Sequence, residues 1–320
     1  MLHSSGSKPW SRTVLVAGVI RGSFLRVNGS LFTPFSKRGA RLLPVRVAVV
    51  GHVEWIEFAR VERVPVSGEI VHVLESWQEP GGGGAVAAVQ LAKLAGAATL
   101  YTALGDDELG HRSKAELEAL GLRVEAAFRP EPQRRAFVYV DRAGERTITV
   151  IGNRLGPGPD DPLAWDELSA TDAVYATAGE PPAIRAARQA RVLVGTARDL
   201  QTLRKAEVEL DALVASASDA GEGYETGELD PAPRLVARTA GAAGGRWEAA
   251  DGHSGAWDAT PLPGPVSDAY GCGDSFAAGS TYGLGAGLGV PGALHVGARC
   301  GAACMTGRGP YSAQLTSAQL

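Results

Sequence analysis

The sequence contains few cysteines and no apolar run long enough for a membrane span. Its 320 residues include only three cysteines, Cys272, Cys300 and Cys304, and their spacing matches no metal site. Cys300 and Cys304 lie four residues apart in a predicted helix, so we expect them side by side in a core rather than in a disulfide. The apolar residues 14–20 are too few to cross a bilayer and are followed by Arg21. These absences favour a cytoplasmic protein without membrane contact.

Acidic residues are missing from the first part of the chain. Residues 1–46 hold eight Lys or Arg and no Asp or Glu, which gives this segment a charge of +8. Because the net charge of the chain is −4, the rest of the chain carries −12. This net charge gives no reason to expect nucleic-acid binding. The composition of residues 1–45 is that of an organellar transit peptide, or of a basic, disordered leader upstream of the true start codon near Val45. We favour the second explanation.

The remaining sequence alternates predicted strands and helices. Residues 46–51 form a β-branched run typical of a buried strand, and residues 58–64 and 69–74 alternate like half-exposed strands. After residue 157 strands and helices alternate, which indicates a parallel sheet covered on both faces. Such sheets bind ligands at the carboxyl ends of their strands. Residues 98–107 are predicted to form a strand followed by a turn. Further strands are predicted at 136–141, 146–150, 173–176, 191–194, 212–215 and 235–239, and helices at 85–94, 108–120 and 293–305.

One segment has the composition of a phosphate site. Residues 267–279 read Ser-Asp-Ala-Tyr-Gly-Cys-Gly-Asp-Ser-Phe-Ala-Ala-Gly, a glycine-punctuated turn that leads into a helix. Gly271 and Gly273 permit a tight turn and a close approach to a ligand. The unpaired first-turn amides of the helix favour an anion. Asp274 would stand beside that anion as a general base for phosphoryl transfer, or it is an ordinary helix N-cap.

A second glycine-rich loop precedes a predicted helix. Gly82, Gly83 and Gly84 come directly before the Ala-rich residues 85–94. The loop lacks the Lys-Ser/Thr of a P-loop and the spacing of a dinucleotide fingerprint. Taken alone, it is equally well explained as a flexible turn.

The segment around Asp274 is similar to a known signature. Asp268-x-x-Gly271-x-Gly273-Asp274-Ser275-Phe276-x-x-Gly279 resembles the C-terminal motif of the ribokinase/PfkB-type carbohydrate kinases. The resemblance implies that Asp274 is the catalytic base and that Gly271, Cys272 and Gly273 form the anion hole. Cys272 stands where Ala is usual.

This resemblance extends over residues 46–313 and implies a fold and a domain organisation. The expected fold is a ribokinase-like three-layer α/β/α sandwich with a mainly parallel central sheet and a small β-sheet lid. The kinase domain would comprise residues 46–314, with the lid contributed by about 56–76 and 134–150, followed by a tail at 315–320. The resemblance also implies a homodimer formed through the lid.

Two further motifs resemble nucleotide-binding segments of the family. Thr239, Gly241 and Gly244 match a T-x-G-x-x-G turn whose hydroxyl and amides face the phosphates of ATP. Ser216 and Asp219 occupy the positions of an N-x-x-E motif.

In the family this N-x-x-E motif orders Mg²⁺ and its water. Asp219 would act on the metal through water, and Glu222 is the alternative residue for this role. The segment is also explained without a metal, as a polar loop that caps a helix. In many members of the family a monovalent cation such as K⁺ binds near the C-terminal helices.

The expected acceptor site departs from the family pattern. Gly82, Gly83 and Gly84 look like the N-terminal G-G-x-G motif that approaches the sugar. Glu54 stands where Asn is usual, however, and Ile56 and Val86 stand where sugar-binding Asp and Asn are usual. A site that reads hydroxyl groups depends on such side chains. The sequence therefore does not predict ribose as the acceptor.

Candidates to rebuild the pocket follow the first strand. They are Glu54, Trp55 and Glu57, although Trp55 is equally explained as a core or lid aromatic. The favoured function is ATP-dependent phosphorylation of an alcohol on a small sugar-like acceptor. A nucleoside kinase of the same fold, or a nucleotide- or metabolite-binding regulator without catalysis, are the alternatives.

Overall fold

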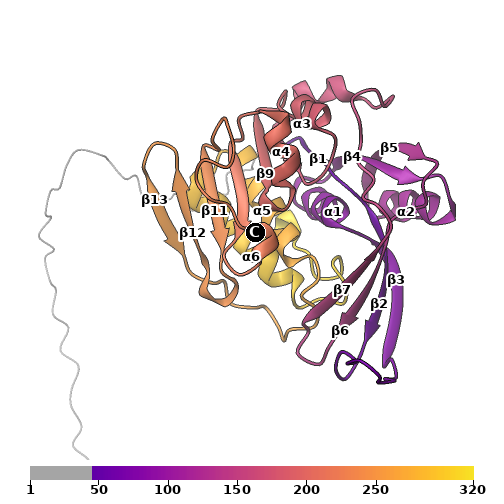
Figure 1. Ribbon diagram of the computed structural model, residues 1–320. Helices are drawn as coiled ribbons and strands as arrows, with labels where there is room; N and C mark the ends of the chain where they lie inside the picture. The colour runs from indigo at the N-terminus through magenta and orange to yellow at the C-terminus, as the bar shows by residue number, and fades with distance from the viewer. Residues whose placement is uncertain (1–44) are drawn as a thin grey trace, which may run out of the picture. The chain divides into compact units, whose positions relative to one another are not determined.

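A mainly parallel sheet of nine strands organises the chain (Figure 1). The computed structural model describes residues 45–320, so the predicted leader lies outside the described residues except for Val45. The strand order is β13-β12-β11-β10-β9-β8-β1-β4-β5. Neighbours from β11 to β5 pair in parallel, whereas β12 and β13 are antiparallel. The strands are β1 (Val47–Val50), β4 (Ala98–Gly105), β5 (Leu122–Arg129), β8 (Ala173–Ala176), β9 (Val192–Thr196), β10 (Ala212–Ser216), β11 (Leu235–Thr239), β12 (Gly245–Ala249) and β13 (Ser254–Trp257).

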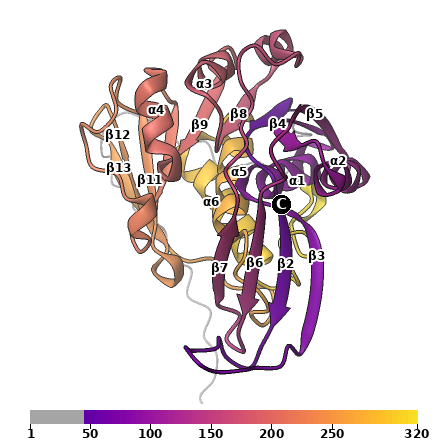
Figure 2. The ribbon, with the colours of Figure 1, turned by 45° about the vertical axis from the view of Figure 1, so that its right-hand side comes forward.

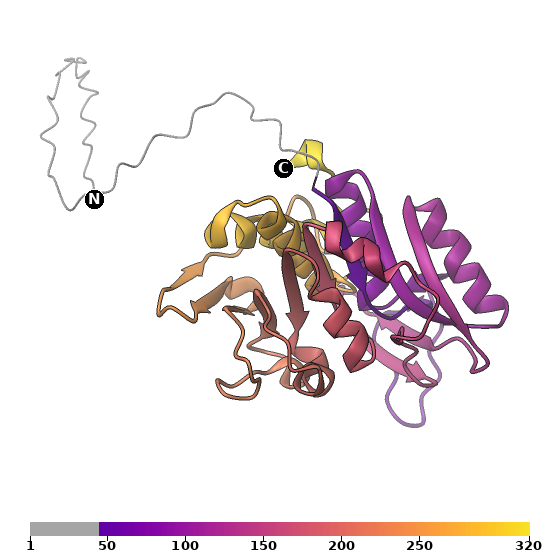
Figure 3. The ribbon, with the colours of Figure 1, turned by 90° about the horizontal axis from the view of Figure 1, so that it is seen from above.

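Helices cover both faces of this sheet, which confirms the predicted three-layer sandwich. One apolar core contains side chains of α1 (Gly83–Ala95), α2 (Glu108–Ala119), α5 (Cys272–Gly285) and α6 (Gly289–Cys304). A second core contains those of α3 (Pro181–Ala187), α4 (Leu200–Ala206) and the 3₁₀ helix η1 (Trp165–Ala170). Alternate strand residues enter the two cores, as the pleat requires. Figure 3 shows α5 and α6 in yellow and α3 and α4 in red on opposite sides of the sheet.

A separate sheet of four strands forms the predicted lid (Figure 2). Its order is β3-β2-β6-β7, with β2 (Glu54–Arg60), β3 (Glu75–Gly81), β6 (Arg135–Val140) and β7 (Arg146–Ile151). The prediction of a strand at 69–74 was wrong, because β3 begins only at Glu75. The carboxylate of Glu69 instead pairs with Arg63 and accepts a hydrogen bond from the amide of Val66. These contacts close a local turn.

Buried thiols agree with the prediction for α6. Cys300 and Cys304 are both buried and neither forms a disulfide. Beyond α6, Leu315 and Leu320 pack against the first core, so the predicted tail contacts the folded body. No helix within residues 45–320 is long and apolar enough to cross a membrane.

Candidate active site

The N-terminus of α5 forms the centre of the candidate site. Gly271 caps the helix with φ 79°, and a Cβ on it would lie 2.9 Å from the side chain of Val86. Gly271 is therefore required by the backbone conformation and by packing. Gly273 differs, because a Cβ there would meet no described atom within 4 Å. Packing does not require a glycine at 273, so space beside the first turn of α5 is open to a ligand of the first-turn amides.

The second glycine loop meets the same helix. A Cβ on Gly83 would lie 2.8 Å from Asp274 Oδ1, so a side chain at position 83 would displace this carboxylate from its present place. Gly82 has φ 84°, and its amide donates to the Tyr270 hydroxyl at 2.9 Å. The structure thus brings Gly82, Gly83 and Asp274 together, with the N-termini of two helices at one place.

The carboxyl group of Asp274 has an unusual pKa. Its side chain is partly buried in the first turn of α5. Burial raises the pKa of Asp274 to about 7, and the negative charge of Glu222 adds to the rise, while Arg198 opposes it. A base with a pKa near neutral can both hold and release a proton at physiological pH. The site is therefore suited to removing a proton from an alcohol.

Next to Asp274 lies a buried group of polar side chains that the sequence did not reveal in full. Glu54 is 6 % exposed and pairs with Arg134, with Oε1 to Nε at 2.7 Å. His52 Nε2 is 3.6 Å from Glu54, and His52 Nδ1 has no hydrogen-bond partner among residues 45–320. Burial, followed by Arg154 and Arg134, lowers the pKa of His52, so its ring is neutral. The predicted site residue Glu54 therefore lies beside His52, and its charge is already paired with Arg134.

The nucleotide motifs lie at the carboxyl ends of adjacent strands. Thr239 pairs in register with Ser216, so the ends of β11 and β10 are side by side. The Thr239 hydroxyl donates to the carbonyl of Ala215 at 3.3 Å. A Cβ on Gly244 would lie 2.0 Å from the carbonyl of Trp257, whereas one on Gly241 would meet no described atom within 4 Å. Gly244 is thus required for close packing against the Trp257 backbone, whereas Gly241 faces open space.

Asp219 is engaged by an arginine. Arg198 Nη2 lies 2.6 Å from Asp219 Oδ2 and 2.6 Å from Glu222 Oε1. The amide of Gly221 and the charge of Arg198 lower the pKa of Asp219, so it is ionised. The Ser216 hydroxyl accepts a hydrogen bond from the amide of Asp219 at 3.1 Å, which fixes the turn between these two residues. Within residues 45–320 no group of three or more His, Cys, Asp or Glu could hold a metal ion without help from a ligand.

The departures from the family pattern lie inside the protein. Ile56 and Val86 are fully buried in the first core, so these positions offer no polar group to an acceptor. Trp55 is also buried, and the guanidinium of Arg112 covers its ring at 4.4 Å. It is therefore a lid aromatic packed under α2. Glu57 is exposed.

Sequence reasoning missed His52, Arg134 and Arg198. His52 follows β1, and Arg198 lies in the 3₁₀ helix η2 (Ala197–Asp199) directly after β9. Both positions are carboxyl ends of central parallel strands, where ligands bind in such sheets. The rule that ligands bind at the carboxyl ends of parallel strands could have identified His52 and Arg198 from the sequence. Arg134 lies on the lid side, before β6, and no local pattern marks it.

Comparisons with known proteins agree with the fold and indicate a family. A family model described as pfkB family carbohydrate kinase matches residues 45–317. An ATP-dependent ribose-1-phosphate kinase of Halopiger xanaduensis is 35 % identical over 111 residues, which is 34 % of this chain and 37 % of that protein. The match thus spans little more than a third of this curated relative.

Solved structures match over nearly the whole folded part. A putative ribokinase from Agrobacterium tumefaciens is 21 % identical with a TM-score of 0.73, covering 86 % of this chain and 95 % of its own. Ribokinase from Arabidopsis thaliana, solved with ribose and ATP, is 18 % identical with a TM-score of 0.66, covering 87 % and 97 %. These likenesses describe the fold, and the family match covers the glycine loops and Asp274 alike. The chain therefore belongs to the pfkB family of carbohydrate kinases.

Proposed function

We propose that the protein transfers the γ-phosphoryl group of ATP to an alcohol of a small sugar-like acceptor. The observation that carries this proposal is the position of Asp274. Its carboxylate lies in the first turn of α5, with a pKa of about 7, against the Gly83 backbone. A base at the edge of an anion-binding helix terminus is what phosphoryl transfer to an alcohol needs.

Each group at this terminus has one task in the proposed reaction. Asp274 removes the proton of the acceptor hydroxyl as its oxygen attacks the γ-phosphorus, and ADP leaves with the electrons of the broken P–O bond. The amides of Cys272, Gly273 and Asp274 stabilise the negative charge on the phosphoryl oxygens. The open space at Gly273 allows these oxygens to come within hydrogen-bond distance of the backbone. The α1 terminus at Gly83 adds a second positive dipole end.

The ends of β10 and β11 are the proposed nucleotide side. Thr239 and Gly241 would face the phosphates of ATP, and Ser216 would hold the Asp219 turn. Mg²⁺ prefers carboxylates and keeps several waters, so Asp219 and Glu222 are suitable ligand types. Both are already paired with Arg198, which supports a role for Asp219 through water rather than by direct contact. Bound Mg²⁺ would neutralise phosphate charge.

The acceptor is a sugar-like alcohol, and a nucleoside is the second candidate within the same reaction. The replacement of polar residues by Ile56 and Val86 argues against plain ribose. A regulator without catalysis is less well supported, because it would not need a base with the pKa of Asp274.

Three finer proposals concern assembly, ions and location. A homodimer through the lid is supported by apolar side chains of β7, since Ile148, Val150 and Ile151 are all exposed. Light scattering of a variant with these residues changed to Lys would test it. K⁺ activation would appear as faster turnover in K⁺ than in Na⁺. The three unpaired thiols are consistent with the reducing cytoplasm.

Acceptor-dependent ADP release tests the proposed function. The purified protein is incubated with ATP, Mg²⁺ and a panel of sugars, sugar derivatives and nucleosides, and each product is identified by mass spectrometry. We expect one added phosphoryl group on at least one acceptor. Nucleotide binding without any phosphorylated product would favour the regulator instead.

A further inference from the structure

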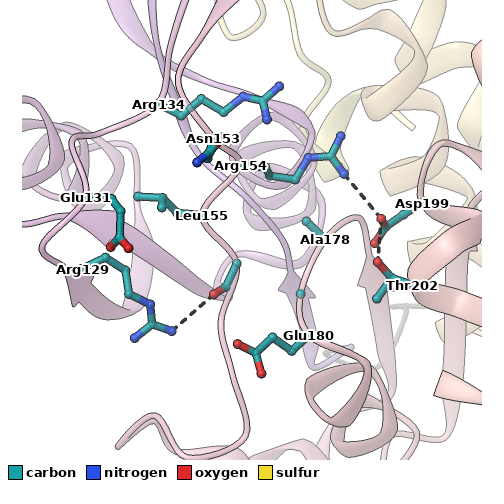
Figure 4. Close-up of a pocket in the computed structure, with 12 residues that line it drawn as sticks. Arg129, Glu131, Arg134, Asn153, Arg154, Leu155, Ala178, Glu180, Asp199 and Thr202 are labelled. Atoms are coloured by element: carbon teal, nitrogen blue, oxygen red, sulfur yellow. Dashed lines mark hydrogen bonds and ion pairs between the residues drawn. The ribbon is translucent and has the colours of Figure 1, made fainter. Parts of the chain in front are cut away.

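A large cavity lies beside the candidate active site (Figure 4). Its volume is about 630 Å³, within the range of small-molecule sites. The end of β5, the segment after β7, the end of β8 and the start of α4 form its walls. Arg134, the partner of buried Glu54, joins the cavity to the surroundings of His52 and Asp274. An acceptor held by Asp274 would extend into this space.

The cavity has three arginines, yet each has a carboxylate partner. Arg129 makes two hydrogen bonds to Asp161, at 2.6 and 2.7 Å. Arg134 pairs with Glu54, and Arg154 lies 3.5 Å from Asp199. The rim adds the exposed acids Glu131 and Glu180. The cavity therefore carries no excess positive charge for a phosphate.

Asp199 is a wall residue with an incomplete set of hydrogen bonds. It is only 8 % exposed. Its Oδ1 accepts from the Thr202 hydroxyl at 2.9 Å, whereas its Oδ2 has no partner within the described chain. An unpaired buried oxygen is costly, and the residue that bears this one lines the cavity. Figure 4 shows the Arg154 side chain directed at the same carboxylate, with a contact of 3.5 Å. Within residues 45–320 its guanidinium makes no other hydrogen bond, so its other N–H groups are available to a ligand.

We infer that Asp199 and Arg154 form the acceptor-reading pair of this protein and bind adjacent hydroxyl groups of an uncharged, polyhydroxylated acceptor. The inference rests on the proposed function. The Asp199 carboxylate turns to present Oδ2 to the cavity and accepts a hydrogen bond from one hydroxyl, and the remaining N–H groups of Arg154 donate to its neighbour. The pair takes over the hydroxyl contacts that Ile56 and Val86 cannot make.

A phosphorylated acceptor is disfavoured by the same geometry. Its anion would meet Asp199 together with Arg154, and the repulsion of one charge cancels much of the attraction of the other at this distance. The related ribose-1-phosphate kinase has such an acceptor in its name, so the two chemistries can be compared directly.

Matched pairs of acceptors test this inference. The two pairs are glucose with glucose 1-phosphate and ribose with ribose 1-phosphate. Maltose is added as a larger neutral sugar, and every probe has a free hydroxymethyl group. Turnover is measured at saturating ATP, and thermal shift is measured without ATP. We expect the neutral member of a pair to be preferred. Asp199→Asn should raise its KM about tenfold or more, and Arg154→Gln should do likewise, with the KM for ATP unchanged.

Asp166→Asn provides the matched control, because it makes the same carboxylate-to-amide change at an exposed position of η1. Preference for the phosphorylated member, with improved binding in Asp199→Asn, would overturn the inference in favour of an anion site. If no probe is phosphorylated, the proposed function fails for this panel, and the thermal shift still decides. A stabilisation by neutral sugars that is lost in Asp199→Asn supports the pair, and its absence refutes the pair.

Discussion

The first turn of α5 and the strand β2 meet at the same site, yet they differ in how closely they follow the family pattern. The α5 terminus keeps Gly271, Gly273 and Asp274, and its geometry leaves open space over unpaired amides. The β2 side has Ile56 buried in the core and Glu54 neutralised by Arg134. Phosphate chemistry is common to all acceptors, whereas the acceptor site must fit one molecule. We therefore interpret the chain as a kinase with unchanged transfer chemistry and an altered acceptor.

The largest expected effect comes from removing the base. Asp274→Asn keeps the size of the side chain but cannot accept a proton, so turnover should fall about 10² to 10⁴-fold. ATP affinity should be retained or improved, because a negative charge beside the phosphates is gone. Both are measured on the purified variant by steady-state kinetics and calorimetry. A loss of less than about tenfold would remove Asp274 from the mechanism.

The same variant has a built-in control for folding. The pKa of Asp274 is raised to about 7 in the folded protein, so its ionisation lowers stability progressively as the pH rises from the ordinary range of a carboxyl group, and in full above about pH 7. Asp274→Asn should therefore melt no lower than the wild type at pH 8. A clearly lower melting temperature would mean that any loss of turnover reflects damage to the fold.

A smaller loss is expected from filling the space over the α5 amides. Gly273→Val places a side chain where no described atom lies within 4 Å, so the fold should survive while phosphate approach is blocked. Loss of oxyanion-type contacts typically costs about 10² to 10³-fold in turnover. Circular dichroism and kinetics provide the measurement. Near-normal turnover in the folded variant would show that the phosphate binds elsewhere.

The pH dependence should follow Asp274 directly. Its pKa is about 7, and the base must be ionised, so turnover should fall about tenfold per pH unit below that value. Glu222 contributes to the raised pKa of Asp274, so Glu222→Gln should shift this limb to lower pH. A rate profile that is flat between pH 5 and 8 would contradict a base at this position.

The smallest effect is expected outside the domain. Deletion of residues 1–44 should leave turnover and melting temperature nearly unchanged, because the family match begins at residue 45. Thermal denaturation of the truncated and full chains checks this. A truncated protein that does not fold would show that the leader is structural.

The parts of the fold predicted best were those encoded by neighbouring residues. The buried run of β1, the helices α1 and α2 and the Gly271–Asp274 turn each have a local pattern, and the structure confirms them. The strand β3 begins later than predicted, because the Glu69 carboxylate pairs with Arg63 and closes a turn. The alternation of apolar residues does not reveal this turn.

The acceptor side could not be read in the same way. Glu54 was identified from its position, but its partner Arg134 is 80 residues away in the sequence and has no motif. Arg154 and Asp199 come from the segment after the lid and the end of β9, and only the folded chain brings them within 3.5 Å. Contacts of this kind depend on tertiary structure.

The most direct test is a comparison of ribose with other acceptors in a phosphoryl-transfer assay that uses γ-labelled ATP. We expect a phosphorylated product with at least one neutral sugar-like or nucleoside acceptor, and a kcat/KM for ribose lower by about tenfold or more, since Ile56 and Val86 cannot bind its hydroxyl groups. Efficient and preferred phosphorylation of ribose would contradict an altered acceptor site.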